Sequence, residues 1–175
     1  MSQTLLLHEG GRLEPSKAAD LFRQHHLALF RYAFRLTGRR DIAEDVVQEV
    51  FVRVVRGLET YRPAGRDLAW LFTIARRLLI DHQRSRRRQP DEMPVVYLSE
   101  PRSDPSQELA VALAQALGDV PEADREAFLL REIGGLSYQE IAAVCDGTID
   151  AVRSRIYRAR MRLRAALSTG VKVTT

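Results

Sequence analysis

Apolar residues recur at helical spacing along most of this chain, and no segment alternates apolar and polar residues as a half-buried strand does. The pattern predicts helices over about 16–36, 41–57, 66–88, 108–117 and 122–133, and two more on either side of a turn at 146–147. Asp41 and Glu44 have the spacing of a capping box, which predicts the start of the second helix. We therefore predict an all-α fold.

Residues 89–107 interrupt this helical pattern. The stretch contains four prolines and an excess of acidic side chains, a composition typical of a linker. We expect two small helical domains, residues 16–88 and 108–168, joined by a flexible linker. The ends, residues 1–15 and 169–175, are expected to be flexible.

The last two helices have the layout of a helix-turn-helix. Ser137 and Glu140 form a predicted capping box at the start of the first helix. Its buried side is expected to comprise Leu136, Ile141 and Val144. The Asp146-Gly147 pair ends this helix, and Thr148 can cap the next one, which is rich in arginine. A short helix, a turn and a basic helix are typical of a DNA reader.

Periodicity fixes the register of the basic helix. One apolar stripe is expected to face the core: Val152, Ile156, Ala159 and Leu163. The opposite face carries side chains that hydrogen bond bases or phosphates: Asp150, Arg153, Ser154, Tyr157 and Arg158. Further along, Arg160, Arg162 and Arg164 are expected to contact phosphates or acidic protein. The alternative is a solvated basic helix that only closes a helical bundle.

The first domain has two candidate surfaces of its own. One face of the second helix is acidic and amide-bearing, and is either solvated or a protein-docking face: Asp45, Gln48, Glu49, Val52 and Arg56. Six arginines and one acid between residues 76 and 88 indicate phosphate contacts. The preceding loop, residues 59–66, holds Tyr61 beside arginines, which suits stacking of unpaired bases, although Tyr61 packing on the core is an equal alternative.

Composition narrows the function class. The formal net charge of +4 favours an anionic partner. No apolar run approaches the roughly 18 residues of a membrane span, and the short apolar start lacks a basic segment, so we expect a cytoplasmic protein without membrane insertion. Cys145 is the single cysteine, which rules out an intramolecular disulfide; we expect a small buried residue there, with redox tuning as the alternative.

The histidines, the cysteine and the glycines of the chain do not favour an enzyme. The four histidines and Cys145 form no ligand-spaced cluster, and no Gly-rich phosphate loop is present. We expect no catalytic residue, no metal and no cofactor. A conventional helix-turn-helix regulator that acts without polymerase remains an alternative, but it leaves the second basic surface and the aromatic loop unexplained.

Several segments, in order, resemble bacterial sigma factors of the extracytoplasmic-function type, compact members of the sigma-70 family. The segments are Leu29–Gly38, Ala43–Phe51, Ala69–Arg76, Leu130–Ala142 and Val152–Arg155. The resemblance implies that the first domain is sigma region 2, which docks on the clamp of the RNA polymerase β′ subunit and captures flipped bases of the melted promoter element. It implies that the second is region 4, which docks on the flap of the β subunit and reads the duplex upstream element. These elements lie near about −10 and about −35 of the promoter.

The resemblance also assigns residues to roles. Polymerase docking falls on Asp45, Gln48 and Glu49. Contacts to the melted element fall on Tyr61, Arg62, Arg76, Arg77, Asp81 and Arg84. Contacts to the upstream element fall on Arg131, Arg153, Ser154, Tyr157 and Arg158. Such factors commonly have an anti-sigma partner, so one is implied here.

Two departures from the family pattern affect base preference. Arg77 stands where many members have Asn, and Asp150-Ala151 stand where many have Gly-Thr. The base preferences of other family members are therefore not assigned to this chain. Asp150 suits the start of a helix, and its carboxylate could accept a hydrogen bond from a cytosine amine. Roughly 20 base pairs separate the two promoter elements, a distance of about 65–70 Å. The extended linker reaches about 60 Å, and the widths of the two domains make up the difference.

Overall fold

A computed structural model describes residues 15–56, 66–88 and 105–170. These residues form seven α-helices and no strand, which confirms the predicted all-α class. In chain order the helices are α1 (Pro15–Thr37), α2 (Arg40–Arg56), α3 (Asp67–Arg88), α4 (Pro105–Gly118), α5 (Glu122–Glu132), α6 (Tyr138–Val144) and α7 (Ile149–Gly170). Each predicted helix is present, and α4 begins at Pro105, inside the stretch expected to be linker.

The predicted capping box of α2 is wrong. The helix begins at Arg40, and the carbonyl of Arg39 accepts from the Ala43 N–H at 3.1 Å. Glu44 forms an ion pair with Arg40 at 2.7 Å, while the Asp41 carboxylate pairs with Arg39 at 2.5 Å. The neighbouring arginines therefore engage the two acids that were expected to cap the backbone.

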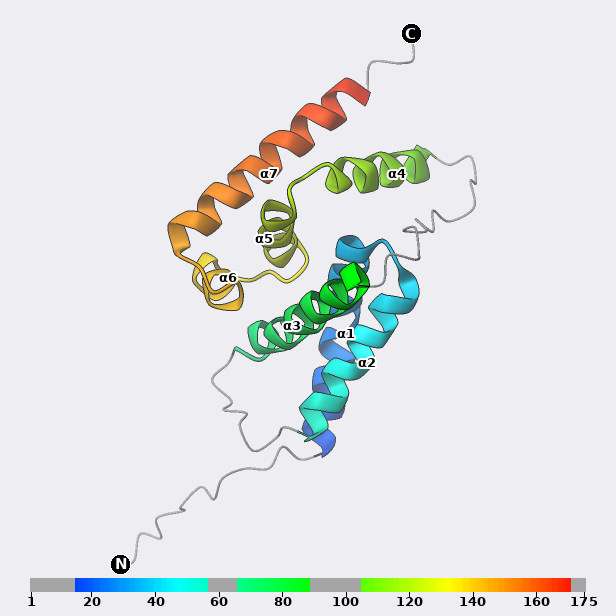
Figure 1. Ribbon diagram of the computed structural model, residues 1–175, viewed down its shortest axis with the longest axis vertical. Coiled ribbons are helices and arrows are strands. Elements are labelled where there is room, and N and C mark those ends of the chain that lie inside the picture. The colour runs from blue at the N-terminus through cyan, green and yellow to red at the C-terminus, as the bar shows by residue number, and fades with distance from the viewer. Residues whose placement is uncertain (1–14, 57–65, 89–104, 171–175) are drawn as a thin grey trace, which may run out of the picture.

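Helices α1–α3 form the N-terminal domain. In Figure 1, α1 and α2 run antiparallel, connected by a turn at Gly38, whose φ of +68° favours glycine. One face of α2 is apolar and is buried against α1 and α3. Fully buried side chains from all three helices make the core, including Leu29, Val50 and Leu71. Each such side chain contributes about 1.5–3 kcal/mol by leaving water.

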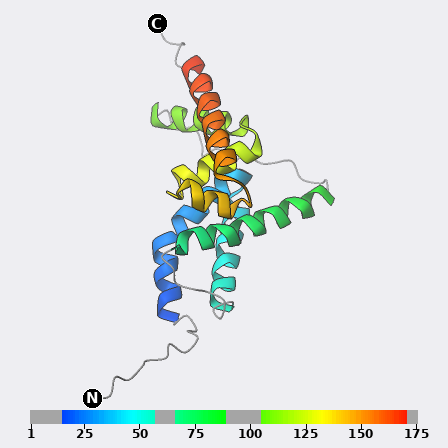
Figure 2. The same cartoon turned by 90° about the vertical axis from the view of Figure 1, so that its left-hand side faces the viewer.

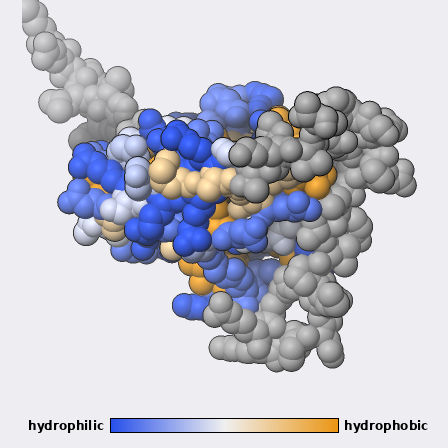
Figure 3. All heavy atoms as spheres, turned by 90° about the horizontal axis from the view of Figure 1, so that it is seen from above, coloured by the Kyte–Doolittle hydropathy of each residue, from blue (hydrophilic) through white to orange (hydrophobic). Residues whose placement is uncertain are grey.

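Helices α4–α7 form the C-terminal domain, in which α7 packs on α5, α6 and α4 (Figure 1). Its core is built from Leu130 of α5, Ile141 of α6 and the buried stripe of α7. Seen from the end at which α4 and α7 lie, the surface carries mainly hydrophilic side chains, with apolar residues in a band between them (Figure 3). None of the described helices is long and apolar enough to cross a membrane.

Local hydrogen bonds define both ends of α6 and the start of α7. The Ser137 hydroxyl accepts from the Glu140 N–H at 3.2 Å, and Glu140 accepts from the Ser137 N–H at 2.8 Å, so the predicted capping box is confirmed. At the other end, Asp146 adopts a φ of +50°, and the Gly147 N–H reaches the Ala142 carbonyl at 2.9 Å. Thr148 then caps α7 by accepting from the Ala151 N–H at 3.2 Å, as predicted.

The two domains pack directly on each other. Helices α5 and α6 lie against α1 and α3, and the view in Figure 2 shows α3 crossing beneath the C-terminal domain. Gly134, between α5 and α6, lies so close to Phe72 of α3 that an added Cβ would come within 2.8 Å of its ring. The same Cβ would lie 2.6 Å from the Leu130 carbonyl oxygen, so both neighbours require glycine at position 134.

Candidate nucleic-acid interface

The outward face of α7 has the register predicted from the sequence. The stripe of Val152, Ile156, Ala159 and Leu163 is buried, with at most 5% of each residue exposed. Four side chains on the opposite face are exposed and line a shallow depression of about 410 Å³: Arg153, Ser154, Tyr157 and Arg158. The ring of Tyr157 lies at the surface, with 64% of the residue exposed. The face therefore offers hydrogen-bond donors around an exposed ring.

Two of the predicted upstream readers are held by acids of the protein itself. Arg158 donates to both carboxylate oxygens of Asp124 in α5, at 2.8 and 2.6 Å. These bonds raise the pKa of Arg158 above its ordinary value. Arg153 donates to Asp150 at 3.2 Å one turn earlier in α7. Both arginines thus have some donors occupied and others free for a ligand.

Arg131, the remaining predicted reader, lies apart from the outward face of α7. Its Nη1 donates to the Leu136 carbonyl at 2.7 Å, and its guanidinium lies 5.4 Å from the centre of the Tyr138 ring. It is half-buried at the entrance to the helix-turn-helix. In this position it braces the loop before α6.

The basic part of α3 presents two different faces. Arg77, Asp81 and Arg84 are exposed and share one face, since they are spaced i, i+4 and i+7. Arg76 lies on another face and is half-buried. Its Nε forms an ion pair with Glu126 of α5 at 3.0 Å. The structure therefore brings three of these predicted residues together and places Arg76 between the domains.

Glu126 is the centre of a polar cluster between the domains. One carboxylate oxygen accepts from Arg76 and from the buried Tyr32 hydroxyl of α1 at 3.2 Å; the other lies 3.8 Å from the Cys145 thiol. Burial and the adjacent Glu126 carboxylate raise the pKa of Tyr32 well above its usual value and that of Cys145 to about 12. Cys145 is thus buried, as predicted for a small core residue, and is protonated at neutral pH.

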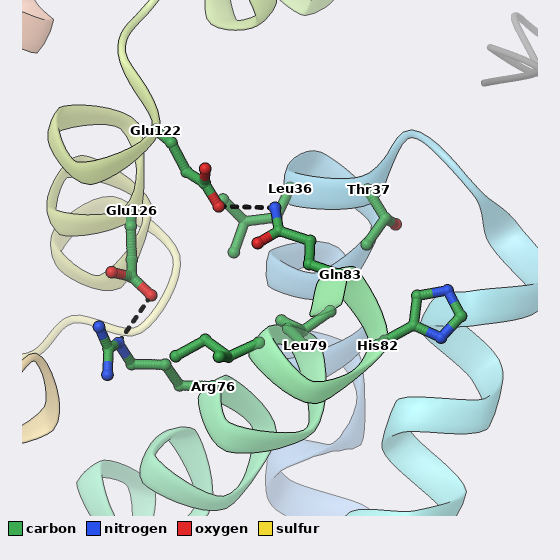
Figure 4. Close-up of a pocket in the computed structure, with 9 residues that line it drawn as sticks. Leu36, Thr37, Arg76, Leu79, His82, Gln83, Glu122 and Glu126 are labelled. Atoms are coloured by element: carbon green, nitrogen blue, oxygen red, sulfur yellow. Dashed lines mark hydrogen bonds and ion pairs between the residues drawn. The ribbon is translucent and has the colours of Figure 1, made fainter. Parts of the chain in front are cut away.

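A cleft of about 130 Å³ lies beside this cluster, where the end of α1, α3 and α5 meet. Figure 4 shows Glu122 and Glu126 reaching from α5 toward Gln83 and Arg76 of α3, while His82 points away from α5. Gln83 donates to Glu122 at 2.6 Å. The cleft is formed by side chains of both domains, so it exists only while the domains are in contact.

Comparison with known proteins identifies both halves of the chain. The model of Sigma-70 region 2 matches residues 21–89, and that of Sigma-70, region 4 matches residues 110–163. The EcfG sigma factor of Rhodopseudomonas palustris is 34% identical over 80% of this chain and 79% of its own length. The chain belongs to the extracytoplasmic-function sigma factors of the sigma-70 family.

Further similarities agree with this assignment. The SigE sigma factor of Mycolicibacterium smegmatis is 39% identical over 85% of this chain, which spans 61% of that relative's length. The structure of the sigma factor RpoE of Bartonella quintana, in complex with the anti-sigma factor NepR, has a TM-score of 0.75 and 27% identity, covering 87% of this chain and 98% of that one. The match therefore extends over both domains. This family is not one of enzymes.

Region 2 carries the predicted docking face on α2. Asp45 and Gln48 are exposed, and Glu49 is half-exposed in an ion pair with Arg53 at 2.8 Å. Val52 is 37% exposed on the same helix. The face is thus solvated and carries one uncovered apolar side chain. Tyr61 and Arg62 lie outside the described residues.

Sequence reasoning missed the acids that hold the arginines of this interface. Asp124, Glu126 and Glu132 of α5 pair with Arg158, Arg76 and Arg160 respectively. One signal was available for Asp124, which lies one turn before the buried Ala127 on α5. Within the described residues, no group of three or more His, Cys, Asp or Glu side chains is placed to hold a metal ion.

Proposed function

We propose that this chain binds core RNA polymerase, recognises the upstream and downstream elements of a set of promoters, and promotes melting of the downstream element. The observation that supports this most directly is the outward face of α7. Four polar side chains line one exposed face of a capped helix whose other face is fully buried. A helix held in this way can enter a major groove with its base-contacting side chains already facing the DNA.

The proposal assigns the partners by region. Region 2 docks on the β′ subunit through Asp45, Gln48 and Glu49, and contacts the melted strand through Tyr61, Arg62 and the basic part of α3. Region 4 docks on the β subunit and contacts duplex DNA through α7. An anti-sigma factor is a further partner, supported by the similarity to a sigma factor whose structure contains one. All these partners belong to the cytoplasm, where the chain is proposed to act.

The contact between the domains has to be released for this function. A domain of about 70 residues has a radius of gyration of about 11 Å, equivalent to a sphere about 28 Å across. Two such domains in contact have centres about 30 Å apart, whereas roughly 20 base pairs between the promoter elements span about 65–70 Å. Regions 2 and 4 therefore separate when they engage both elements together.

The decisive experiment is run-off transcription with purified core polymerase and a panel of promoter templates. A sigma factor yields promoter-specific transcripts that depend on both elements. A conventional helix-turn-helix regulator instead binds duplex DNA tightly without polymerase and gives no transcript with core polymerase alone. The second outcome would overturn the proposed function.

A further inference from the structure

Asp124 is the charged residue most deeply buried in the described part of the chain, with 4% of its surface exposed. It lies in the first turn of α5, where the helix dipole favours a carboxylate. Its two oxygens face α7 across the C-terminal domain and accept from Arg158, which is 34 positions away in sequence. Burial removes the carboxylate from water, and these charge-assisted hydrogen bonds offset that loss.

The geometry of this pair leaves one edge of the guanidinium free. Nε and Nη2 of Arg158 each donate to one oxygen of Asp124. An arginine has five N–H donors, so three remain, and two of them lie parallel on the edge formed by Nη1 and Nη2. The Arg158 side chain is 51% exposed and borders the depression shared with Arg153, Ser154 and Tyr157. The free edge is therefore accessible from the outward face of α7.

We propose that Asp124 is a positioning residue that makes Arg158 a reader of guanine rather than a phosphate clamp. This inference rests on the proposed function, because it assumes that α7 enters the groove of the upstream element. Two parallel N–H groups match the O6 and N7 acceptors of guanine, and this match requires a fixed guanidinium orientation. A phosphate contact depends mainly on net charge, and Asp124 neutralises the charge of Arg158.

The orientation imposed by Asp124 also lowers the entropic cost of binding. A free arginine side chain loses rotamer entropy when it is fixed in one orientation. In this protein the long side chain is already held by two hydrogen bonds before DNA arrives. Arg153, whose partner Asp150 is exposed and lies on the same helix, is held less firmly.

The test compares upstream-element preferences of variant holoenzymes. Core polymerase loaded with the full chain is incubated with a pool of promoter duplexes in which the upstream element is randomised, and bound templates are sequenced. We expect Asp124→Asn to reduce the guanine preference at one position about tenfold. We expect Arg158→Lys, which keeps the charge but lacks the fork, to reduce the preference at that same position. The matched control is Glu132→Gln, which removes the partner of Arg160 and should leave the profile unchanged.

A second measurement separates positioning from general folding. Binding of the full chain to a duplex without promoter elements should strengthen in Asp124→Asn, and the slope of log K against log salt should steepen by about one, because one neutralising charge is lost. A merely structural role predicts weaker binding with an unchanged base profile.

The inference is overturned if Asp124→Asn or Arg158→Lys retains the base-by-base profile of the parent. If Asp124→Asn does not fold, the profile of Arg158→Lys decides the outcome. If the parent itself shows no upstream preference in holoenzyme, the proposed function fails, which is a different result.

Discussion

Arg76 on α3 and Glu126 on α5 form an ion pair with 3.0 Å between Nε and Oε1, which joins region 2 to region 4. The two side chains are 21% and 14% exposed, so solvent screens them only partly. Arg76 is one of the residues that the family resemblance assigns to the melted strand. While the two domains are in contact Glu126 engages this guanidinium, so the DNA contact proposed for Arg76 requires the domains to separate.

The first prediction concerns this closure. Glu126→Gln removes the charge opposite Arg76 and weakens the contact with the Tyr32 hydroxyl, while it preserves the size of the side chain. The open fraction should rise about tenfold, since a charged hydrogen bond contributes about 1.5–3 kcal/mol. Small-angle scattering of the free chain should show a larger radius of gyration. Glu132→Gln, which breaks an ion pair within region 4, is the control; identical scattering of parent and Glu126→Gln would contradict the prediction.

The second prediction concerns docking on core polymerase. Reversing the charges of Asp45 and Glu49 should weaken binding to the polymerase without loss of helicity, because both side chains lie at the surface of α2. The measurement is co-elution with core polymerase together with circular dichroism. Reversal of Asp20, an exposed acid on α1, is the control. Unchanged co-elution of the double variant would exclude this face as the docking site.

The third prediction concerns the melted element. Arg77 and Arg84 share an exposed face of α3 and are proposed to contact the single-stranded backbone, while Tyr61 stacks on an unpaired base. Alanine at Tyr61, or at both arginines, should impair open-complex formation more than initial duplex binding. Permanganate reactivity of unpaired thymines measures the melted state. Normal melting in the Tyr61→Ala protein would remove that residue from the proposed site.

The fourth prediction separates base reading from phosphate contact on α7. Arg153→Ala should cost about 1–3 kcal/mol at one base position of the upstream element. Arg164→Ala should instead weaken binding evenly across sequences and lower the salt slope by about one. Transcription from templates carrying each single substitution of the element provides the profile. If Arg153→Ala keeps the preferences of the parent, Arg153 is a phosphate clamp.

The fifth prediction concerns the stability of region 4 in acid. Hydrogen bonds from the Ser137 hydroxyl and N–H, at 2.7 and 2.8 Å, lower the pKa of Glu140 below its ordinary value. A lowered folded-state pKa gives stability that is present above the unfolded pKa of about 4.3 and is lost as pH falls through the folded pKa. Glu140→Gln should therefore lose less stability than the parent between neutral and acid pH.

Thermal unfolding from pH 7 down to pH 3 measures this effect. At neutral pH the variant should already be less stable, since an N-terminal cap contributes about 1 kcal/mol. Ser137→Ala, which removes the hydroxyl partner, should lower neutral stability in the same way and also flatten the acid response. Parallel pH curves for parent and Glu140→Gln would show that this carboxylate does not contribute.

Local spacing of apolar residues was enough to predict the helices and the register of α7. Two features depend only on residues within a few turns of each other, so local spacing predicts them. They are the capping box at Ser137 and the periodic burial of Val152, Ile156, Ala159 and Leu163. The same local reasoning failed at Asp41 and Glu44, because the helix begins one residue earlier, at Arg40, and neighbouring arginines pair with both carboxylates.

The acids that hold the arginines of the candidate interface depend on packing between distant parts of the chain. Asp124 meets Arg158 across 34 positions, and Glu126 meets Arg76 across 50 positions and between two domains. In sequence Glu126 is indistinguishable from a solvated residue on a helix surface, and the one signal for Asp124, its spacing from the buried Ala127, does not say which arginine it meets. The partner of each acid is set by how α5 packs on α7 and α3, and that packing depends on the shape and burial of many side chains together, which no local pattern of charges encodes.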